Sequence, residues 1–331
     1  MNFDVFNGDA DGIISLLQLR LHEPRPAQLI TGIKRDISLV KNIPLDAVNP
    51  NSQITILDIS LRKNKEALVA LLKTEAKVLY IDHHKPGPIP NTANLTTHIE
   101  QSARKCTALI IDDLLEGKFH NWAITAAYGD NLTQVANELA SDAGLNKQQK
   151  ELLEELGTLI NYNGYGANTD ELAYHPAVLF ELLLSYNCPF ECIADADSPY
   201  HRLKDLYEED YRRASKAEIL HQSSNCYCLL LENNGPSRRI SGSYGNELAN
   251  EFPTRAHIIL TTLDAEHYLV SLRAPRNRKK GAGDICAQFE TGGGRAAAGG
   301  INKLSKARVY ELIDAVEQYY SESTLKNDMK G

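Results

Sequence analysis

Four clusters of acidic and histidine side chains each follow a predicted strand or helix directly. They are Asp9 and Asp11 after residues 3–6, Asp58 after 54–57, Asp82 with His83 and His84 after 77–81, and Asp130 after a helical stretch. Because the carboxyl ends of parallel strands share one edge of a sheet, these side chains are expected to meet there. The residue types and their positions therefore predict one polar site assembled from distant parts of the chain.

Several carboxylates at one sheet edge would repel one another, and the pKa of each would rise unless cations neutralise them. Two divalent ions would remove this repulsion. Carboxylates together with an imidazole suit Mn²⁺ or Mg²⁺, and the imidazole favours Mn²⁺. Two ions roughly 3.5–4 Å apart can activate water and stabilise an in-line displacement at phosphorus. The pattern predicts a centre of two Mn²⁺ ions that hydrolyses phosphate esters, with Mg²⁺ as the less favoured ion.

Each cluster taken alone also has a purely structural interpretation. A single Asp after a strand, such as Asp58, usually caps a helix or occupies a turn. Asp9 and Asp11 could likewise cap the helix that follows them. The tandem His83 and His84 is the least common of these patterns, because a solvated turn seldom needs two imidazoles. The chemical interpretation rests on the combination of all four clusters.

The elements that must position these residues alternate between strands and helices in the first hundred residues. Strands are predicted at 3–6, 54–57 and 77–81, with helical periodicity between them. This alternation indicates a mainly parallel sheet with right-handed crossovers. Helices are predicted next at 103–116, 120–128, 132–143 and 147–160. Residues 1–160 are therefore expected to form a parallel-sheet catalytic domain that binds the metal ions.

The remainder of the chain divides into a connector and a second, smaller domain, which makes the whole chain α/β. Residues 161–224 are predicted to be a helical connector that begins with a Gly- and Asn-rich loop. Strands are then predicted near 226–232, 256–262 and 267–273, and helices near 244–252, 283–290 and 305–320. We expect residues 225–325 to form a substrate-binding α/β domain.

This second domain contains a glycine-rich segment, Gly292, Gly293 and Gly294, followed by Arg295. Backbone amides of glycine can approach a phosphate closely because no Cβ atom intervenes. Arg273, at the end of a predicted strand, and Arg295 carry guanidinium groups suited to a terminal phosphate or a base edge. These five residues are predicted to bind the substrate.

Size, composition and charge limit the classes of function. The chain has 331 residues, of which 43% are hydrophobic and 24% charged, as in an ordinary globular protein of two domains. No apolar run approaches the roughly 20 residues of a membrane span, and no secretory signal precedes the first strand, so a cytoplasmic location and no membrane partner are expected. The net charge of -8 argues against a long nucleic acid as partner, whereas a short phosphorylated substrate needs only a local basic pocket.

Four segments resemble, in order and spacing, the motifs of the DHH phosphoesterase family. They are VFNGDADGI (5–13), LDIS (57–60), YIDHHKPG (80–87) and AAYGDN (126–131). Downstream, VSLRAP (270–275) and TGGGRAAAGG (291–300) resemble the glycine-rich signature of the C-terminal domain associated with that family. The resemblance spans about residues 1–131 and 225–320, and the combination of DHH with three glycines is highly specific.

The resemblance implies a role for each matching residue. Asp9 and Asp11 would be terminal metal ligands, Asp58 would bridge two ions, and His83 and Asp130 would complete the ligands of one ion. Asp82 would orient His83, and His84 would face the scissile phosphate or the leaving oxygen. Arg273 would stabilise charge that develops on the phosphoryl oxygens.

Two positions depart from the family pattern. Many members have a His four residues before the first Asp, where this chain has Val5, so one ion would have fewer protein ligands, with water or Asn7 in that place. The His that usually follows the three glycines is Arg295 here, which keeps a hydrogen-bond donor but does not titrate near neutral pH.

The implied substrate is a very short linear oligonucleotide, with a dinucleotide such as pGpG favoured, which would connect the chain to c-di-GMP signalling. The alternative substrates within the family are cyclic dinucleotides, 3′-phosphoadenosine 5′-phosphate and longer single strands. Hydrolysis of longer single strands would make the protein a RecJ-like exonuclease. A catalytically weak nucleotide sensor that has lost one ion is the alternative from another class, motivated by Val5. The sequence leaves the base preference undecided and a homodimer open.

Overall fold

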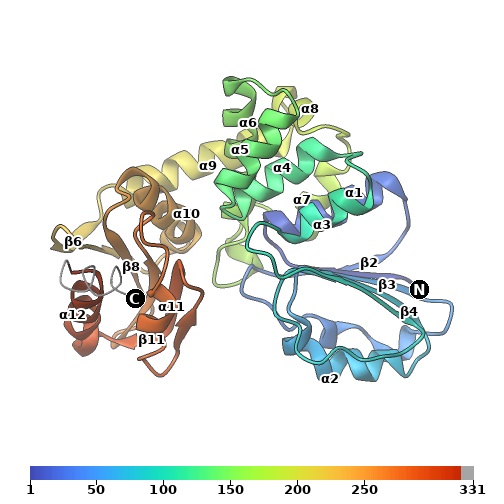
Figure 1. Cartoon of the computed structure of the whole chain (residues 1–331), viewed down its shortest axis with the longest axis horizontal. Helices are drawn as coiled ribbons and strands as arrows, with labels where there is room; N and C mark the ends of the chain where they lie inside the picture. The colour runs from blue at the N-terminus through green and yellow to red at the C-terminus, as the bar shows by residue number, and fades with distance from the viewer. Residues whose placement is uncertain (322–331) are drawn as a thin grey trace, which may run out of the picture. The chain divides into compact units, whose positions relative to one another are not determined.

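The computed structural model describes residues 1–321 as two compact units, with the division between Leu206 and Tyr207 (Figure 1). Both units combine strands and helices, so the chain is α/β, as predicted. The last four residues of the predicted second domain, 322–325, lie outside the described residues. No helix within residues 1–321 has both the length and the apolar character needed to cross a membrane.

The first unit contains a five-stranded sheet in which every neighbouring pair is parallel. Its strands are β1 (Phe3–Phe6), β2 (Gln28–Ile30), β3 (Gln53–Leu57), β4 (Lys77–Asp82) and β5 (Leu95–Ile99), in the order β2-β1-β3-β4-β5. The three predicted strands, β1, β3 and β4, are the central ones. The sequence did not predict β2 and β5, because edge strands are half exposed and their apolar pattern is weak.

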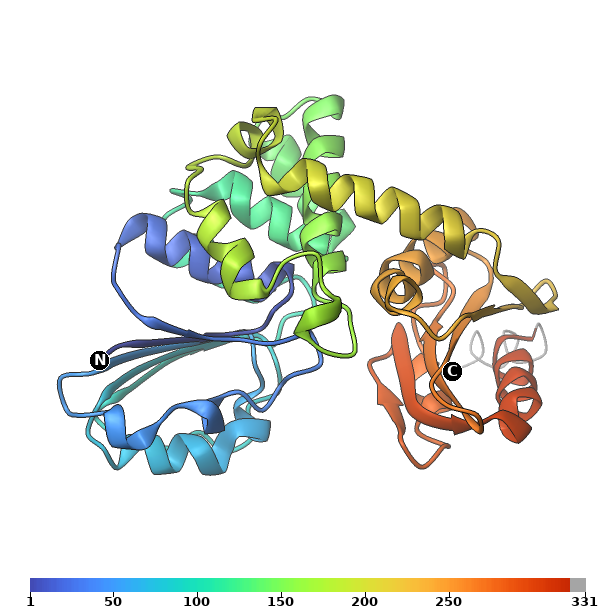
Figure 2. The same ribbon diagram turned by 180° about the vertical axis from the view of Figure 1, so that it is seen from behind.

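Helices cover both faces of this sheet. They are α1 (Ala10–His22), α2 (Leu61–Leu72), α3 (Thr107–Leu114), α4 (His120–Gly129), α5 (Thr133–Asp142), α6 (Lys147–Asn163), α7 (Pro176–Leu183) and α8 (Pro189–Ala194), with α9 (Pro199–Ala214) at the division. Short 3₁₀ turns occur at Val40–Asn42, Leu45–Ala47 and Thr169–Glu171. The α2 helix lies on one face, and α1, α3 and α4 lie on the other, as the view from behind also shows (Figure 2). The four helices predicted between residues 103 and 160 are present.

The core of the first unit explains why these segments adopt this arrangement. Alternate residues of the central strands, such as Val5 and Ile56, are fully buried and pack with Leu68 and Leu71 of α2. Side chains that alternate along a strand point to opposite faces, so continuous apolar strands require helices on both sides. This three-layer packing fixes the carboxyl ends of β1, β3 and β4 side by side.

The second unit contains a six-stranded mixed sheet in the order β10-β11-β9-β8-β7-β6. The strands are β6 (Glu218–Gln222), β7 (Cys226–Leu231), β8 (Ala256–Thr262), β9 (His267–Arg273), β10 (Gly292–Gly294) and β11 (Ala298–Ser305). Only β7 and β8 are parallel; the other pairs are antiparallel. The β6 strand falls within the predicted connector. Strands β10 and β11 were not predicted, and the glycine-rich segment forms β10.

Three helices pack on the second sheet. They are α10 (Gly235–Glu251), α11 (Ala282–Cys286) and α12 (Val309–Tyr320), the last preceded by a 3₁₀ turn at Lys306–Arg308. Ile285 and Leu312 place α11 and α12 in one core cluster with Ile258 and Leu260. The α10 helix begins well before the predicted position near residue 244, because Asn234 accepts a hydrogen bond from the Ser237 N–H as a helix cap.

Candidate metal centre

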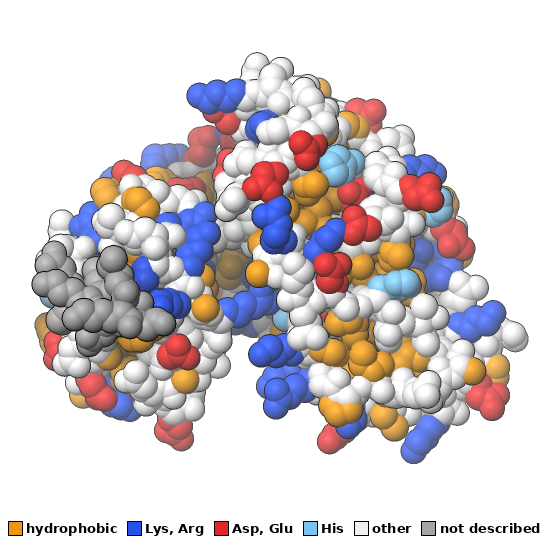
Figure 3. Space-filling model, in the orientation of Figure 1, with side chains coloured by type: hydrophobic (Ala, Val, Ile, Leu, Met, Phe, Trp, Pro, Cys, Tyr) orange, Lys and Arg blue, Asp and Glu red, His pale blue; other side chains and the backbone are white. Residues whose placement is uncertain are grey.

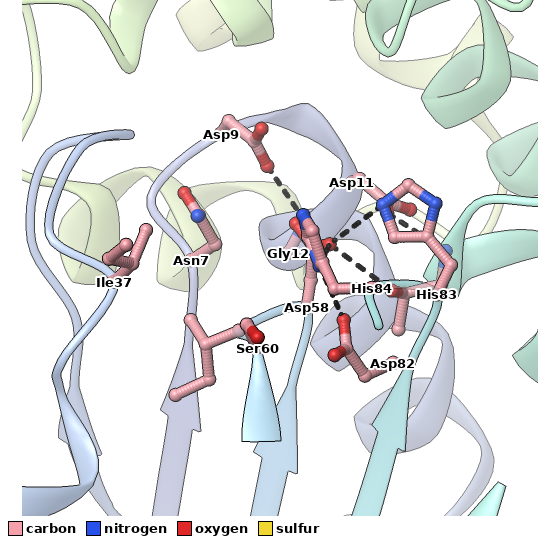
Figure 4. Close-up of polar contacts among 12 residues, drawn as sticks. Asn7, Asp9, Asp11, Gly12, Ile37, Asp58, Ser60, Asp82, His83 and His84 are labelled. Carbon is pink, nitrogen blue, oxygen red and sulfur yellow. Dashed lines mark hydrogen bonds and ion pairs between the residues drawn. The ribbon is translucent and has the colours of Figure 1, made fainter. Parts of the chain in front are cut away.

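The loops after β1, β3 and β4 bring the predicted acidic residues and both histidines to one edge of the first sheet (Figure 4). Asp9 caps α1, Asp11 lies in the first turn of α1, Asp58 follows β3 and Asp82 is the last residue of β4. Close packing of the backbone makes this convergence possible: a Cβ atom on Gly12 would lie 2.2 Å from the Asn7 carbonyl oxygen.

Asp11 is held at the start of the α3 helix. Its Oδ2 accepts the Thr107 N–H at 2.8 Å and its Oδ1 accepts the Ala108 N–H at 2.7 Å. The amino end of a helix stabilises negative charge, so this buried carboxylate is kept in one orientation. Each oxygen retains a further lone pair for another ligand.

Asp58 combines backbone strain with burial. Its φ of 55° lies in the left-handed region, which is unfavourable for residues other than glycine. The Asp58 N–H donates to the Ile81 oxygen at 3.1 Å, and the Thr107 hydroxyl donates to Asp58 Oδ1 at 3.2 Å. Burial, together with the charges of Asp11, Asp9 and other carboxylates, raises the pKa of Asp58 well above its usual value. Strain and a raised pKa together are typical of a functional position.

The His83 side chain has a defined tautomer. Its Nδ1 lies 3.1 Å from the backbone oxygen of Lys105, which can only accept, so Nδ1 carries the proton. In the neutral imidazole, Nε2 then keeps its lone pair, and it faces Asp58 Oδ1 at 3.5 Å and Asp11 Oδ2 at 3.8 Å. These three atoms can all act as ligands of one cation. This arrangement fits a divalent metal ion.

Asp130 completes this group of ligand atoms from the end of α4. One atom each from Asp11, His83 and Asp130 lie within 4.8 Å of one another, and the same holds for Asp58, His83 and His84. Burial raises the pKa of Asp130, and Lys34 opposes this change while Asp11 adds to it. The preceding Gly129 is required by packing, since a Cβ atom there would lie 2.5 Å from the Ala10 Cβ.

Asp82 contacts His84 rather than His83, which differs from the role implied by the family resemblance. His84 Nδ1 lies 2.6 Å from Asp82 Oδ1, while His83 is oriented by the Lys105 backbone. The chain leaves β4 after Asp82, and the backbone that follows brings the His84 ring back to the Asp82 carboxylate. Among the described residues, Asp82 Oδ2 is buried without a hydrogen-bond partner, so this carboxylate has capacity for a further contact.

Asp9 is turned toward a lysine. Its Oδ1 accepts the Gly12 N–H at 3.1 Å, and its Oδ2 lies 2.6 Å from the Lys34 ammonium. Burial raises the pKa of Asp9, but the charge and hydrogen bond of Lys34, together with the Gly12 N–H, outweigh it, so the pKa is lowered. Asp9 is absent from the two groups of ligand atoms described above.

Position 5 offers no metal ligand, because Val5 is fully buried in the sheet core. Asn7 lies on the strand end beside Asp9 (Figure 4). Its Nδ2 donates to the Lys34 oxygen at 3.3 Å, and its buried Oδ1 has no hydrogen-bond partner among residues 1–321. This oxygen is available to a ligand in the way expected for Asn7.

The predicted substrate-binding residues of the second unit gather at one end of its sheet. Arg273 pairs with Ala298 across β9 and β11, and Gly294 pairs with Gly299. The guanidinium of Arg273 is held by Asn246 Oδ1 at 2.6 Å and by Ser271 Oγ at 2.9 Å, both within the same unit. Arg273 therefore has a fixed orientation.

The three glycines form the edge strand β10 instead of a free turn. Gly292, Gly293 and Gly294 pair with Ile301, Gly300 and Gly299 of β11. Among residues 1–321, no atom beyond Gly293 and its two chain neighbours lies within 4 Å of the position that a Cβ on Gly293 would occupy, so this residue borders open space. Arg295 follows at the exposed end, where its N–H donates to the Ala298 oxygen at 2.8 Å.

Three residues at the metal centre were not singled out from the sequence: Lys34, Lys105 and Thr107. Lys105 and Thr107 act through backbone atoms or a single hydroxyl, which leave no recognisable pattern. Lys34 lies in a loop with no recognisable motif. The loop follows the short strand β2, and only the pairing of β2 with β1 would have indicated that Lys34 lies near the metal centre.

Comparisons with known proteins agree with this fold. Residues 4–141 match the DHH family, N-terminal domain. No curated protein sequence matches the chain. Among solved structures, RecJ in complex with Mn²⁺ from Thermus thermophilus is 16% identical, with a TM-score of 0.59 over 97% of this chain and 52% of that chain.

Another structure, of exonuclease RecJ bound to manganese, is 17% identical, with a TM-score of 0.56 over 97% of this chain and 90% of that chain. The pGpG-specific phosphodiesterase PggH from Vibrio cholerae is 14% identical, with a TM-score of 0.53 over 97% and 99% of the two chains. At such identities the likeness shows the fold alone. The match to the DHH family, N-terminal domain, thus covers the part of the chain that carries the four motifs and the candidate metal centre.

Proposed function

We propose that the protein is a Mn²⁺-dependent phosphodiesterase that hydrolyses short linear oligonucleotides, with a dinucleotide such as pGpG as the favoured substrate. The observation that supports this most directly is the Nε2 atom of His83, which faces Asp58 Oδ1 at 3.5 Å and Asp11 Oδ2 at 3.8 Å. Because Nδ1 donates to the Lys105 carbonyl, the neutral imidazole presents its Nε2 lone pair beside two carboxylate oxygens. One divalent cation can bind all three atoms.

The donor set suits Mn²⁺ better than Mg²⁺. It combines one imidazole with carboxylates, and imidazole favours the softer ion. In the proposed centre, Asp11, His83 and Asp130 hold one ion, Asp58 bridges, and Asp9 contacts the second. When bound, two such ions would activate water and stabilise the charge on the phosphoryl oxygens.

His84 and Asp82 are proposed to act on the substrate. The hydrogen bond of 2.6 Å to Asp82 fixes the His84 ring and leaves Nε2 as the free nitrogen. The His84 side chain keeps 31% of its surface exposed, against 8% for His83, so it is the more accessible of the two histidines. A positioned and accessible imidazole can give a proton to the leaving oxygen.

Residues of the second unit are proposed to bind the nucleotide. The Arg273 guanidinium is held in one orientation by Asn246, Ser271 and the Gly242 oxygen, and its positive charge is suited to a phosphate. Gly293, beside open space, and the exposed Arg295 are suited to the same ligand. The net charge of -8 and the presence of both acidic and basic side chains on the first unit (Figure 3) favour a small ligand over a long strand.

The experiment compares substrates directly. The protein is incubated under Mn²⁺ with pGpG, a cyclic dinucleotide, 3′-phosphoadenosine 5′-phosphate and a single strand of about 20 nucleotides, and products are separated by chromatography. We expect mononucleotides to appear fastest from pGpG. Faster cleavage of the long strand would favour a RecJ-like exonuclease. Binding of nucleotides without turnover would favour a sensor.

A further inference from the structure

Lys34 is built into the metal centre by contacts at both its backbone and its side chain. Its N–H donates to the Gly164 oxygen at 2.8 Å, and its own oxygen accepts from Asn7 Nδ2 at 3.3 Å. The ammonium lies 2.6 Å from Asp9 Oδ2 and 2.8 Å from Asn161 Oδ1. It also lies 5.6 Å from the centre of the Tyr165 ring. These contacts come from separate segments of the first unit, so the position of the ammonium is strongly determined.

The Lys34 ammonium pairs directly with one carboxylate of the centre. It lies 2.6 Å from Asp9 Oδ2, and Asp9 is buried. Asp9 is therefore already paired with a cation of the chain itself. Asp11 and Asp58 instead face the imidazole of His83.

A divalent ion beside Asp9 would meet this fixed positive charge. Like charges at short distance in a partly buried site repel strongly, because little water screens them. Val5 adds to the effect, since this buried side chain supplies no ligand. The position formed by Asp11, His83 and Asp130 does not include an atom bound to Lys34.

We infer that Lys34 makes the two ion positions unequal: it occupies the cation position beside Asp9 and weakens the binding of the second ion. One ion binds tightly at Asp11, His83 and Asp130. The second binds on the Asp9 side only in competition with the Lys34 ammonium, so metal concentration sets the fraction of protein with a complete centre. This inference rests on the proposed two-ion centre and is independent of the proposed substrate.

The test counts and ranks bound Mn²⁺ ions in the full chain by titration calorimetry, with free Mn²⁺ measured by electron paramagnetic resonance. The variants are Lys34→Met, which removes the charge, Lys34→Gln, which keeps hydrogen-bond donors, and Lys34→Arg, which keeps the charge. Lys204→Met is the matched control, because the Lys204 ammonium lies 2.6 Å from Glu155 and outside the centre.

For wild type we expect two Mn²⁺ ions per chain with clearly different affinities. Lys34→Met and Lys34→Gln should tighten the weaker site by about tenfold or more and leave the tighter one within about threefold. Lys34→Arg and Lys204→Met should resemble wild type. Without metal, Lys34→Met should melt at a lower temperature, because Asp9 is then buried without a partner, and Mn²⁺ should raise its melting temperature more than that of wild type.

Two results would overturn the inference in distinguishable ways. If both neutral variants leave the weaker site unchanged or weaker, Lys34 does not compete with the ion, while the metal centre itself stands. If wild type binds no Mn²⁺ at all, both the metal centre and the inference fail. Melting curves without metal identify any variant that does not fold, and the remaining neutral variant then decides.

Discussion

The Nδ1 atom of His83 lies 3.1 Å from the backbone oxygen of Lys105, whereas the Nδ1 atom of the neighbouring His84 lies 2.6 Å from a carboxylate oxygen of Asp82. Two adjacent residues of one type therefore have different partners. In the neutral imidazole the carbonyl fixes the proton on Nδ1, so the lone pair of the His83 Nε2 atom is directed at Asp58 and Asp11. His84 is more exposed and is proposed to face the substrate.

These partners predict different consequences for the two histidines. His83→Gln should weaken the binding of the first Mn²⁺ ion by at least about tenfold, because it removes a direct ligand. His84→Gln should keep the Mn²⁺ affinity within about threefold and lower kcat by roughly 10²–10⁴-fold, because it removes a proton donor. Calorimetry and steady-state kinetics on the same preparations give both values. Equal losses of Mn²⁺ affinity in the two variants would contradict the assignment.

Arg273 is expected to bind the substrate through a charge-assisted contact. Arg273→Ala should lower kcat/KM for pGpG by a factor that corresponds to a loss of roughly 1.5–3 kcal/mol of transition-state stabilisation. Asn246→Ala should cause a smaller loss, because Asn246 only orients the guanidinium. Arg308→Ala is the matched control, since Arg308 pairs with Glu311 on the surface.

The contribution of Arg273 should depend on substrate length. A long strand that does not place its end against Arg273 has little to lose, so kinetics on pGpG and on a strand several times longer should differ. Equal losses on both substrates, or none on either, would remove Arg273 from the proposed site.

His257 gives the second unit a pH-dependent stability. Burial, with a smaller effect of Arg255, lowers the pKa of His257 from 6.5 to about 4 in the folded state. Between these values the unfolded state binds the proton more readily, so stability falls as the pH decreases from 6.5 towards 4. His257→Phe should remove most of this dependence, which amounts to about 3 kcal/mol at most.

The measurement is urea denaturation of the wild type and His257→Phe at pH 5 and pH 7.5, following the transition of the second unit. The stability of the variant relative to wild type should be higher at pH 5 than at pH 7.5. Near pH 7.5 the stability of the two proteins should change with pH to a similar extent. A parallel loss of stability in both proteins between the two pH values would show that His257 is not the group responsible.

The central elements of the fold could be predicted from the sequence, whereas the edges could not. Buried strands such as β1 and β3 are short segments in which most residues are apolar, which singles them out. The edge strand β5 is half exposed and has a weaker apolar pattern. Strand β10 consists of three glycines, which have low strand propensity, and only its pairing with β11 makes it a strand.

The candidate site shows the same division. Carboxylates and histidines after strands could be placed at one edge, because parallel strands end together. Their partners could not be predicted: the Lys105 carbonyl acts through the backbone, and Lys34 reaches Asp9 from a loop whose position depends on the edge strand β2. The family resemblance implied that Asp82 orients His83, whereas in the structure Asp82 contacts His84 and the Lys105 carbonyl orients His83.

Without metal, the carboxylates of the centre should repel one another, and the substitution Asp58→Asn should relieve part of this repulsion. The pKa of Asp58 is raised by burial and by Asp11, so its carboxylate destabilises the folded state as the pH rises through its folded pKa. Asp58→Asn should stabilise the metal-free protein at pH 7.5 by on the order of 1 kcal/mol or more, because one repelling charge is removed. Thermal melting in chelator measures this, and a lower melting temperature for the variant would contradict it.

Adding Mn²⁺ should reverse that order of stability. Wild type gains stability by binding the ions, whereas Asp58→Asn lacks the bridging carboxylate and should gain much less. The comparison of melting temperatures with and without Mn²⁺ therefore separates a functional carboxylate from a merely structural one. A similar Mn²⁺-induced increase in both proteins would argue against a bridging role.

The most direct test of the proposed two-ion phosphodiesterase is the rate at which wild type and Asp58→Asn release mononucleotides from pGpG at saturating Mn²⁺. The substitution changes one charge with almost no change in volume, so the fold is kept while the proposed bridge is lost. We predict rapid, chelator-sensitive release by wild type and a rate at background for Asp58→Asn. Near-normal release by the variant, or release by wild type that persists in chelator, would contradict the account.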